Sequence, residues 1–383
     1  MSRFLFVATA GAGGDLPPLI SAAFGLRQNG HEVMFLGDHA VTRQVRELGF
    51  ESEALPSELD LGPRLAAAIR DAMASTGGDL GAAGRIVGER MGVWATETAE
   101  TVGLAVRAPT PHAMVTSLFG VEVLSTLAPP CPWAVVNSTF YVGPNPPRRL
   151  EQDFGPRAIP LISRFASLLE SSPLVLHATD QIFDFSFDGL PSHHRYVGPL
   201  GIWEPPAEPP AYLSDPGHPW VLVSISTQRQ DDVPLAAAAL DALDGRDLRV
   251  LLTVGPDHDP AELGNVPDNA RVEQVAPHSA VLERAALVVS HAGHGTVMKA
   301  LWHGRPMVLV PWGRDQPGVA ARAAALGIGE VIPPEAASAE NLRGAIDRVL
   351  AGAEFAQAAK RHAARLRATD PQGAAAAALE SIV

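Results

Sequence analysis

The chain is 383 residues long, which exceeds the roughly 250 to 300 residues at which a single hydrophobic core stops growing, so we expect two domains. Its formal net charge is −13, from 29 Lys and Arg against 42 Asp and Glu, and no run of basic residues offsets the acidic excess. A nucleic acid or an anionic membrane is therefore not an expected partner.

Cys131 is the only cysteine, which excludes an intramolecular disulfide and a cysteine zinc cluster. The apolar run at residues 3–9 is short and is followed at once by glycines, unlike a signal peptide or a membrane span. We therefore expect a cytoplasmic protein with no membrane span.

Strand and helix patterns alternate through the first half of the chain. Strands are predicted at 3–9, 31–36, 113–117, 133–137, 174–178 and 194–198, and helices at 17–29, 40–48, 62–74 and 80–106. This alternation is typical of a parallel sheet with right-handed crossovers. We expect a first domain at 1–202 and, because prolines are stiff and cannot extend a central strand, a linker at 203–219.

The alternation resumes in the second half, which is expected to form a domain over 220–370. Its predicted strands are 220–226, 249–254, 271–275 and 306–311, and its predicted helices are 233–243 and 297–304, with a short helix and a buried strand inside 281–290. An Ala-rich helix is predicted at 371–383 and could pack back on the first domain. The fold class is thus α/β.

His291, Gly293, Gly295 and Thr296 follow a predicted buried strand and precede a predicted helix. The unpaired N–H groups and the dipole of a helix N-terminus attract anions, phosphate above all. The two glycines allow close approach of the backbone, Thr296 offers a hydroxyl, and His291 a ring N–H. Alternatively, the glycines only make a tight turn and His291 is a satisfied core histidine.

Asp315 and Gln316 come after the next predicted strand, 306–311. A carboxylate beside an amide suits the hydroxyl groups of a sugar. Phosphate at one strand end and hydroxyls at the next indicate a nucleotide sugar lying across the carboxyl edge of a parallel sheet, where open α/β sheets bind ligands.

These motifs resemble those of a known family. The matching runs are 274–282 (QVAPHSAVL), 291–296 (HAGHGT), 304–306 (GRP), Pro311 and 315–316 (DQ), with 14–18 (GDLPP), 30–33 (GHEV) and 49–50 (GF) near the start. Together they resemble the nucleotide-sugar-dependent glycosyltransferases of family 1, the UDP-glucuronosyltransferase-like type with the GT-B fold, and especially bacterial natural-product and macrolide enzymes.

The resemblance implies two Rossmann-like domains with parallel sheets facing across a cleft, the first binding the acceptor and the second the donor. It implies a UDP- or dTDP-linked sugar as co-substrate, with no metal and no other cofactor. Carried over by position, the donor phosphates contact His291, Gly293, Gly295, Thr296, Ser226 and Thr227, the donor sugar contacts Asp315 and Gln316, and the nucleobase lies over Val275, Pro277 and His278.

Transfer of a sugar to a hydroxyl group needs a general base and stabilisation of the departing diphosphate. Where most similar enzymes have a histidine after the first turn, this chain has Asp15, and Val115 to Leu118 supply no carboxylate to orient a histidine. Asp15 is therefore the candidate base. Alternatively, Asp15 only caps the helix that follows it.

The acceptor is expected to be a lipophilic small molecule, because few charges and several aromatics lie in the N-terminal loops. The candidate pocket residues are Trp94, Phe119, Phe140 and Tyr141, although each could equally be a core aromatic. His193 and His194 are interpreted as a solvated loop pair, and no histidine has metal-ligand spacing. A homodimer is possible.

Two other functions remain open. A dinucleotide-dependent oxidoreductase is suggested by Gly11, Gly13 and Gly14 with Asp38 after the next strand, but Leu16 occupies the place of the third glycine and prolines follow. A catalytically inactive accessory protein is suggested by the missing histidine. The sequence does not identify the sugar, the nucleotide or the acceptor.

Overall fold

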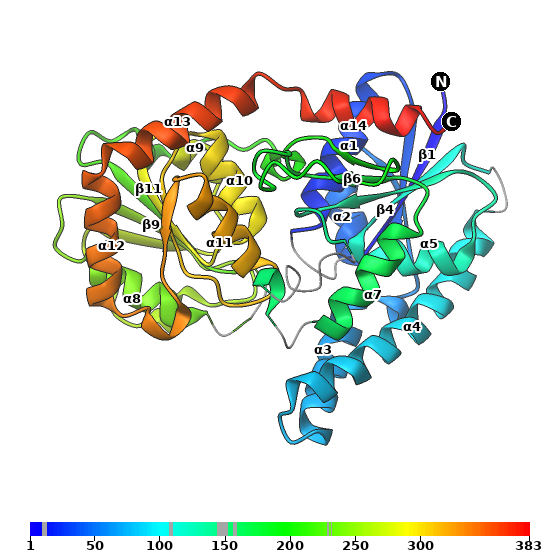
Figure 1. The fold of residues 1–383 in the computed structure, drawn as a ribbon, viewed down its shortest axis with the longest axis horizontal. Coiled ribbons are helices and arrows are strands. Elements are labelled where there is room, and N and C mark those ends of the chain that lie inside the picture. Colours follow the sequence, from blue (N-terminus) through cyan, green and yellow to red (C-terminus); the bar gives the residue numbers. More distant parts are fainter. Residues whose placement is uncertain (10–13, 107–109, 144–151, 156–158, 228–229, 231) are drawn as a thin grey trace. The chain divides into compact units, whose positions relative to one another are not determined.

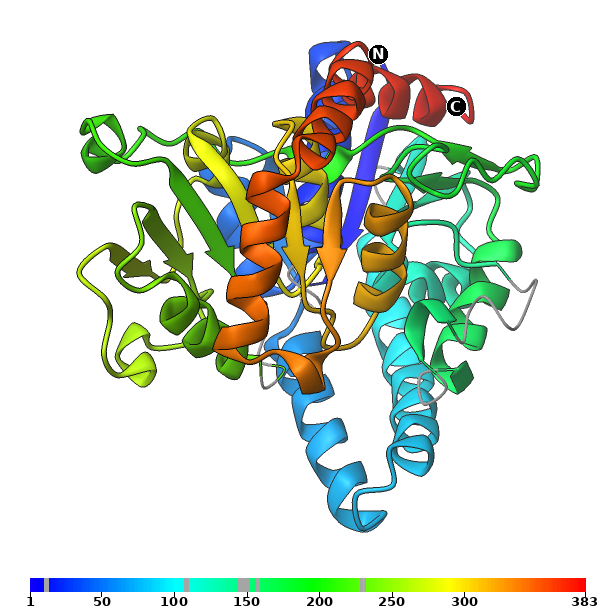
Figure 2. The same ribbon diagram turned by 60° about the vertical axis from the view of Figure 1, so that its left-hand side comes forward.

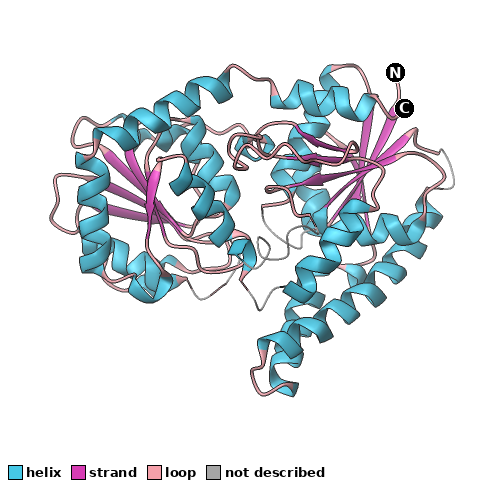
Figure 3. Cartoon of the chain, viewed as in Figure 1, coloured by secondary structure: helices cyan, strands magenta, loops and turns pink. Residues whose placement is uncertain are grey.

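A computed structural model of the chain describes all residues except 10–13, 107–109, 144–151, 156–158, 228–229 and 231. The chain divides into two compact units, Met1–Trp203 with Asp370–Val383, and Glu204–Thr369. Each unit has its own parallel sheet, so the predicted α/β class with two Rossmann-like domains is confirmed (Figure 3). Gly11 and Gly13 lie outside the described residues.

The N-terminal unit is built on a seven-stranded parallel sheet (Figure 1). Its strands in spatial order are β3 (Glu51–Ala54), β2 (Glu32–Gly37), β1 (Arg3–Ala8), β4 (Ala113–Ser117), β5 (Trp133–Asn137), β6 (Val175–His177) and β7 (His194–Tyr196). Strands β2 and β3 follow β1 on one side of the β1–β4 pair, and β5, β6 and β7 follow β4 on the other side. This pair is therefore the topological switch point of the sheet. The loop that follows β1 carries Asp15.

The helices of this unit come from residues 16–170 and from the C-terminal segment of the chain. They are α1 (Leu16–Gln28), α2 (His39–Glu47), α3 (Leu61–Ser75), α4 (Leu80–Ala105), α5 (Val121–Leu127), α7 (Ile159–Glu170) and α14 (Pro371–Glu380). Alternate residues of β1, Phe4 and Phe6 among them, join the buried faces of α1 and α14 in one core. The C-terminal segment 371–380 is thus part of the N-terminal unit, and α14 lies close enough to α1 that a Cβ at Gly25 would sit 2.6 Å from the Gln372 carbonyl oxygen.

The C-terminal unit has a six-stranded parallel sheet. In spatial order the strands are β10 (Ala270–Glu273), β9 (Arg249–Thr253), β8 (Trp220–Ser224), β11 (Ala285–Ser290), β12 (Met307–Leu309) and β13 (Gly329–Val331). The switch point here lies between β8 and β11, which pair in register with Ser224 beside Ser290. The loops after these two strands, which carry Ser226 and His291, therefore begin at the same edge of the sheet.

The described residues of this unit form the α-helices α8 (Val233–Leu243), α9 (His278–Leu282), α10 (His294–Trp302), α11 (Gln316–Ala325), α12 (Ala339–Ala351) and α13 (Ala353–Arg367). The buried faces of α8 and α12 share a core with alternate residues of β8, β9 and β11. Figure 2 shows the ribbon of α12, in orange, lying across this sheet. Residues 204–219, where a linker was predicted, belong to this unit and are held to it by Tyr212, whose hydroxyl donates to Glu273 Oε1 over 2.7 Å.

None of the helices in the described part of the chain has the length and apolar character needed to cross a membrane.

Candidate functional site

The turn between β11 and α10 presents the start of a helix at the carboxyl edge of the second sheet. Gly293 is the N-cap residue, and Val297 donates the first helical hydrogen bond to the Gly293 carbonyl over 3.0 Å. The N–H groups of Gly295 and Thr296 precede this bond and have no carbonyl inside the helix to donate to. These N–H groups, together with the helix dipole, favour an anion at this end of α10, as at the N-terminus of any helix.

The two glycines of this turn are required for space. A Cβ at Gly293 would lie 2.5 Å from His291 Nε2, closer than any real contact, so only glycine lets the imidazole rest against the start of α10. A Cβ at Gly295 would meet nothing within 4 Å, which leaves the first turn open to an approaching ligand. The left-handed residue of the turn is Ala292, with φ +65°.

His291 is 7% exposed and is fixed by the neighbouring strand. Its Nδ1 lies 3.1 Å from the Ser224 carbonyl oxygen, and because a carbonyl only accepts, Nδ1 carries a proton. Burial lowers the pKa of His291, against the raising effects of the Ser224 carbonyl, Asp232 and Asp315. The neutral ring therefore has a lone pair on Nε2, and donation to a phosphate through Nε2 requires the doubly protonated ring.

Ser226 and Thr227 follow β8 at the same edge of the sheet. The Ser226 side chain is buried and its backbone N–H donates to Asp232 Oδ2 over 2.8 Å, whereas Thr227 is exposed. A Cβ at Gly255 would lie 2.8 Å from Thr227 Cα, so this glycine lets the two loops pack closely. Of the pair, Thr227 is the residue accessible to a ligand.

Asp315 and Gln316 occupy different positions in the turn after β12. Gln316 is 2% exposed, and its Oε1 accepts the backbone N–H groups of Trp312 at 2.7 Å and Gly313 at 3.0 Å. Its Nε2 donates to Gln230 Oε1 over 2.8 Å. Gln316 therefore holds the turn in shape, while Asp315, half-buried at the N-cap of α11, makes no capping hydrogen bond.

The predicted nucleobase segment lies between β10 and α9. Val275 is 70% exposed and lines an open hollow of about 960 Å³, together with Pro256, His258 and Gln274. Pro277 is the N-cap residue of α9. Burial lowers the pKa of His278 to about 4, and its Nε2 lies 3.0 Å from Thr253 Oγ1, so His278 is a neutral ring tied to β9.

Asp15 stands at the N-cap position of α1 but makes no capping hydrogen bond. A cap accepts from the N–H groups two and three residues further along, and here these residues are Pro17 and Pro18, which have none. The alternative that Asp15 serves as a side-chain cap is therefore wrong. Its Oδ1 accepts the Ser138 hydroxyl from the end of β5 instead, and the residue is 4% exposed.

The four candidate aromatics of the N-terminal unit are packed to different degrees. Trp94 and Phe140 are buried, and Trp94 Nε1 donates to the Leu59 carbonyl over 2.8 Å. Phe119 is half-buried, with its ring 5.6 Å from that of Phe165. Tyr141 donates its hydroxyl to Glu170 Oε1 over 2.7 Å. Among the four candidates for the acceptor pocket, Phe119 has a partly exposed ring and carries no hydroxyl or indole N–H group that needs a hydrogen-bond partner.

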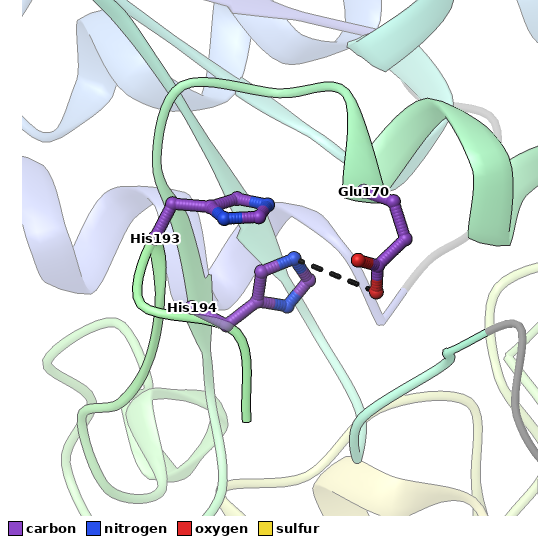
Figure 4. A group of neighbouring side chains, drawn as sticks. All are labelled: Glu170, His193 and His194. Carbon is purple, nitrogen blue, oxygen red and sulfur yellow. Dashed lines mark ion pairs between the residues drawn. The ribbon is translucent and has the colours of Figure 1, made fainter. Parts of the chain in front are cut away.

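His194 departs from the sequence interpretation of a solvated loop pair, because it is 4% exposed at the start of β7. His193 beside it is half-buried, and Figure 4 shows the two imidazole rings beside the Glu170 carboxylate. The prediction failed because β7 has only three residues and brings its first side chain into the interior.

The comparisons with known proteins point in one direction. The family model described as Erythromycin biosynthesis protein CIII-like, C-terminal domain, matches residues 237–380. The 4'-demethylrebeccamycin synthase of Lentzea aerocolonigenes is 34% identical over 206 residues, which are 53% of this chain and 47% of that protein. The O-mycaminosyltylonolide 6-deoxyallosyltransferase of Streptomyces fradiae is 29% identical over 382 residues, which cover 83% of each. The chain thus spans about half the length of the first relative and most of the second.

Among solved structures, the spinosyn rhamnosyltransferase SpnG complexed with thymidine diphosphate superposes with a TM-score of 0.70 over 97% of this chain and 98% of that one, at 19% identity. At this identity the likeness shows the fold alone, and it shows that the chain has the GT-B fold expected from the sequence.

Proposed function

Because residues 237–380 match the family model described as Erythromycin biosynthesis protein CIII-like, C-terminal domain, we propose that this chain is a glycosyltransferase acting on a natural-product aglycone. The observation that carries the proposal is the start of α10. There the N–H groups of Gly295 and Thr296 face outward, and Gly293 makes room for the His291 ring beside them. This is the arrangement that a departing diphosphate needs.

The donor in this proposal is a UDP- or dTDP-linked sugar. A relative of the same fold carries thymidine diphosphate, which supports a pyrimidine nucleotide. The phosphates are assigned to Gly295, Thr296, Thr227 and His291, and the sugar hydroxyls to the carboxylate of Asp315. Gln316 is assigned to shaping the turn that presents Asp315, since both its side-chain groups are already hydrogen-bonded.

The acceptor is assigned to the N-terminal unit, with Asp15 as general base. Asp15 accepts the proton of the acceptor hydroxyl while the oxygen attacks the anomeric carbon, and the bond from that carbon to the diphosphate oxygen breaks. The configuration of the sugar inverts, and the negative charge on the leaving diphosphate is taken up by the start of α10 and by His291. A base that acts in this way contributes about 10²- to 10⁴-fold to the rate. This route uses no metal ion.

Two observations in the N-terminal unit support Asp15 as base. Its carboxylate is not engaged as a helix cap, because Pro17 and Pro18 have no N–H to offer. The Ser138 hydroxyl fixes Oδ1, and this orients the carboxylate as a partner aspartate would orient a histidine base.

The test compares Asp15→Asn with the wild-type chain and with Asp79→Asn, a control at the exposed N-cap of α4. Release of nucleoside diphosphate and transfer to phenolic and macrolide acceptors are measured, and donor affinity is measured by calorimetry with UDP, dTDP and GDP. We expect Asp15→Asn to lower the transfer rate about 100-fold or more with donor affinity unchanged. Unchanged turnover removes Asp15 as the base. Nucleotide binding without transfer to any acceptor favours the accessory-protein alternative.

A further inference from the structure

One carboxylate of the C-terminal unit contacts both helices that begin at the candidate donor site. Glu204 is the first residue of this unit, in the segment where the sequence predicted a linker. Its Oε1 accepts the Lys299 ammonium of α10 over 2.7 Å, and its Oε2 accepts the Ser279 N–H of α9 over 3.0 Å. The two helices lie side by side in Figure 1, so a single side chain joins them.

The ion pair between Glu204 and Lys299 is largely removed from water, with each side chain 16% exposed. Burial raises the pKa of Glu204, but the Lys299 ammonium and the Ser279 N–H group lower it more strongly, so that pKa lies below its usual value. Taking two charges out of water has a cost that a close pair only roughly offsets, so stability alone is a weak account of the pair. What the pair provides is a defined geometry of α9 and α10.

The contact on α9 supplies a cap that the helix lacks in its own sequence. Pro277 is the N-cap residue and makes no side-chain capping hydrogen bond. The Ser279 N–H belongs to the first turn and has no carbonyl partner inside the helix. Glu204 accepts from it and so fixes the start of α9, directly after the segment with Val275 and Pro277 that is assigned to the nucleobase.

The contact on α10 lies on the face of the helix that carries the assigned phosphate ligands. Lys299 follows Gly295 by four residues and Thr296 by three, and residues at these spacings are neighbours on one face. The ion pair therefore holds α10 one turn beyond the N–H groups assigned to the diphosphate. A nucleoside diphosphate must reach the starts of both helices at once, so its affinity depends on the distance between them.

We propose that Glu204 is a positioning residue for the donor: by pairing with Lys299 and capping α9, it holds the nucleobase segment at the distance from the diphosphate-binding turn that a nucleoside diphosphate spans. The inference rests on the proposed function and deepens it, because it concerns the same donor site. A ligand that occupies the start of only one helix does not depend on this spacing. Such a ligand separates positioning from a general effect on folding.

The test compares ligands that reach one or both helix starts, and it uses the full chain. Calorimetry measures the affinities for UDP and dTDP, which reach both, and for inorganic pyrophosphate, which reaches only the start of α10. Glu204→Ala removes both contacts, and we expect it to weaken UDP and dTDP binding about 10-fold or more while pyrophosphate affinity changes less than about 2-fold. The double variant Glu204→Gln with Lys299→Met keeps an acceptor for Ser279 and leaves no unpaired charge, so its loss should be intermediate.

Glu330→Ala is the matched control, because Glu330 of β13 pairs with Arg348 of α12 over 2.8 Å in the same unit. It should leave all three affinities unchanged, and circular dichroism and melting temperature check that every variant is folded. Unchanged UDP affinity in Glu204→Ala, or loss of UDP and pyrophosphate affinity by the same factor, overturns the inference alone. A wild-type chain that binds neither nucleotide overturns the donor assignment and this inference with it.

Discussion

Gly295→Ala is expected to make the protein more stable and its nucleotide binding weaker. Gly295 lies in the first turn of α10, its φ is not in the left-handed region, and a Cβ there meets no atom within 4 Å. Alanine should therefore strengthen the helix by about 0.5 to 1 kcal/mol. For a domain of this size, about 1 kcal/mol corresponds to roughly 2 to 4 °C in melting temperature.

The same methyl group faces the ligand. Cα–Cβ bonds in a helix tilt toward the N-terminus, so a side chain in the first turn points to where an anion approaches. Excluding a phosphate oxygen from one N–H removes a charge-assisted hydrogen bond of about 1.5 to 3 kcal/mol, which weakens nucleotide affinity roughly 10- to 150-fold.

The assay is a thermal scan together with calorimetric titration of UDP and dTDP. Gly344→Ala, in the interior of α12 in the same unit, is the control: it should raise the melting temperature and leave affinity unchanged. If Gly295→Ala binds diphosphate as tightly as the wild type, the phosphates do not approach α10 and the assignment of the donor site is wrong.

Two further predictions concern His291 and the C-terminal helix. Burial lowers the pKa of His291, and a diphosphate on Nε2 would raise that pKa, so binding should take up a proton and nucleotide affinity should rise as the pH falls from about 8 to 6. Calorimetry in buffers of different ionisation enthalpy measures this proton uptake, which should vanish in His291→Gln. Nucleotide affinity of the wild type that does not change with pH would contradict this prediction. Gly25→Ala should destabilise the N-terminal unit by about 1 to 3 kcal/mol, because the new Cβ would sit 2.6 Å from the Gln372 carbonyl oxygen and push α14 from α1. In denaturant unfolding, the control Gly84→Ala, in α4 with open space around it, should leave the stability unchanged or raise it, and equal effects of the two substitutions would argue against the packing of α14 on α1.

The sequence predicted the central strands well and the short outer ones poorly. Residues 113–117 and 133–137 are continuous buried runs, and both strands occur with those bounds. β3 was not predicted, because its sequence is polar and its residues are at most half-buried at the edge of the sheet. β13 was missed for a related reason, since three residues carry too little periodicity to distinguish a strand from a loop.

Part of the candidate functional site could likewise be predicted from the sequence, and part could not. The glycines and His291 could be placed from sequence because strand, turn and helix follow one another within a few residues. The Ser138–Asp15 contact could not, because the two residues are joined only through the pairing of non-adjacent segments. The failure of Asp15 as a cap was visible in the sequence, since Pro17 and Pro18 remove the N–H groups that a cap requires.

Both turns assigned to the donor contain a strained residue that no glycine motif would reveal. Ala292 has φ +65° and Arg314 has φ +58°, and a non-glycine residue in this region costs about 1 kcal/mol. Side chains hold each turn in place: Ser290 Oγ accepts the Ala292 N–H over 3.1 Å, and Gln316 Oε1 accepts the Gly313 N–H over 3.0 Å. The bent backbone is therefore fixed by neighbouring hydrogen bonds before any ligand arrives, and the glycines at 293 and 295 are free to serve the close approach of an imidazole and an anion.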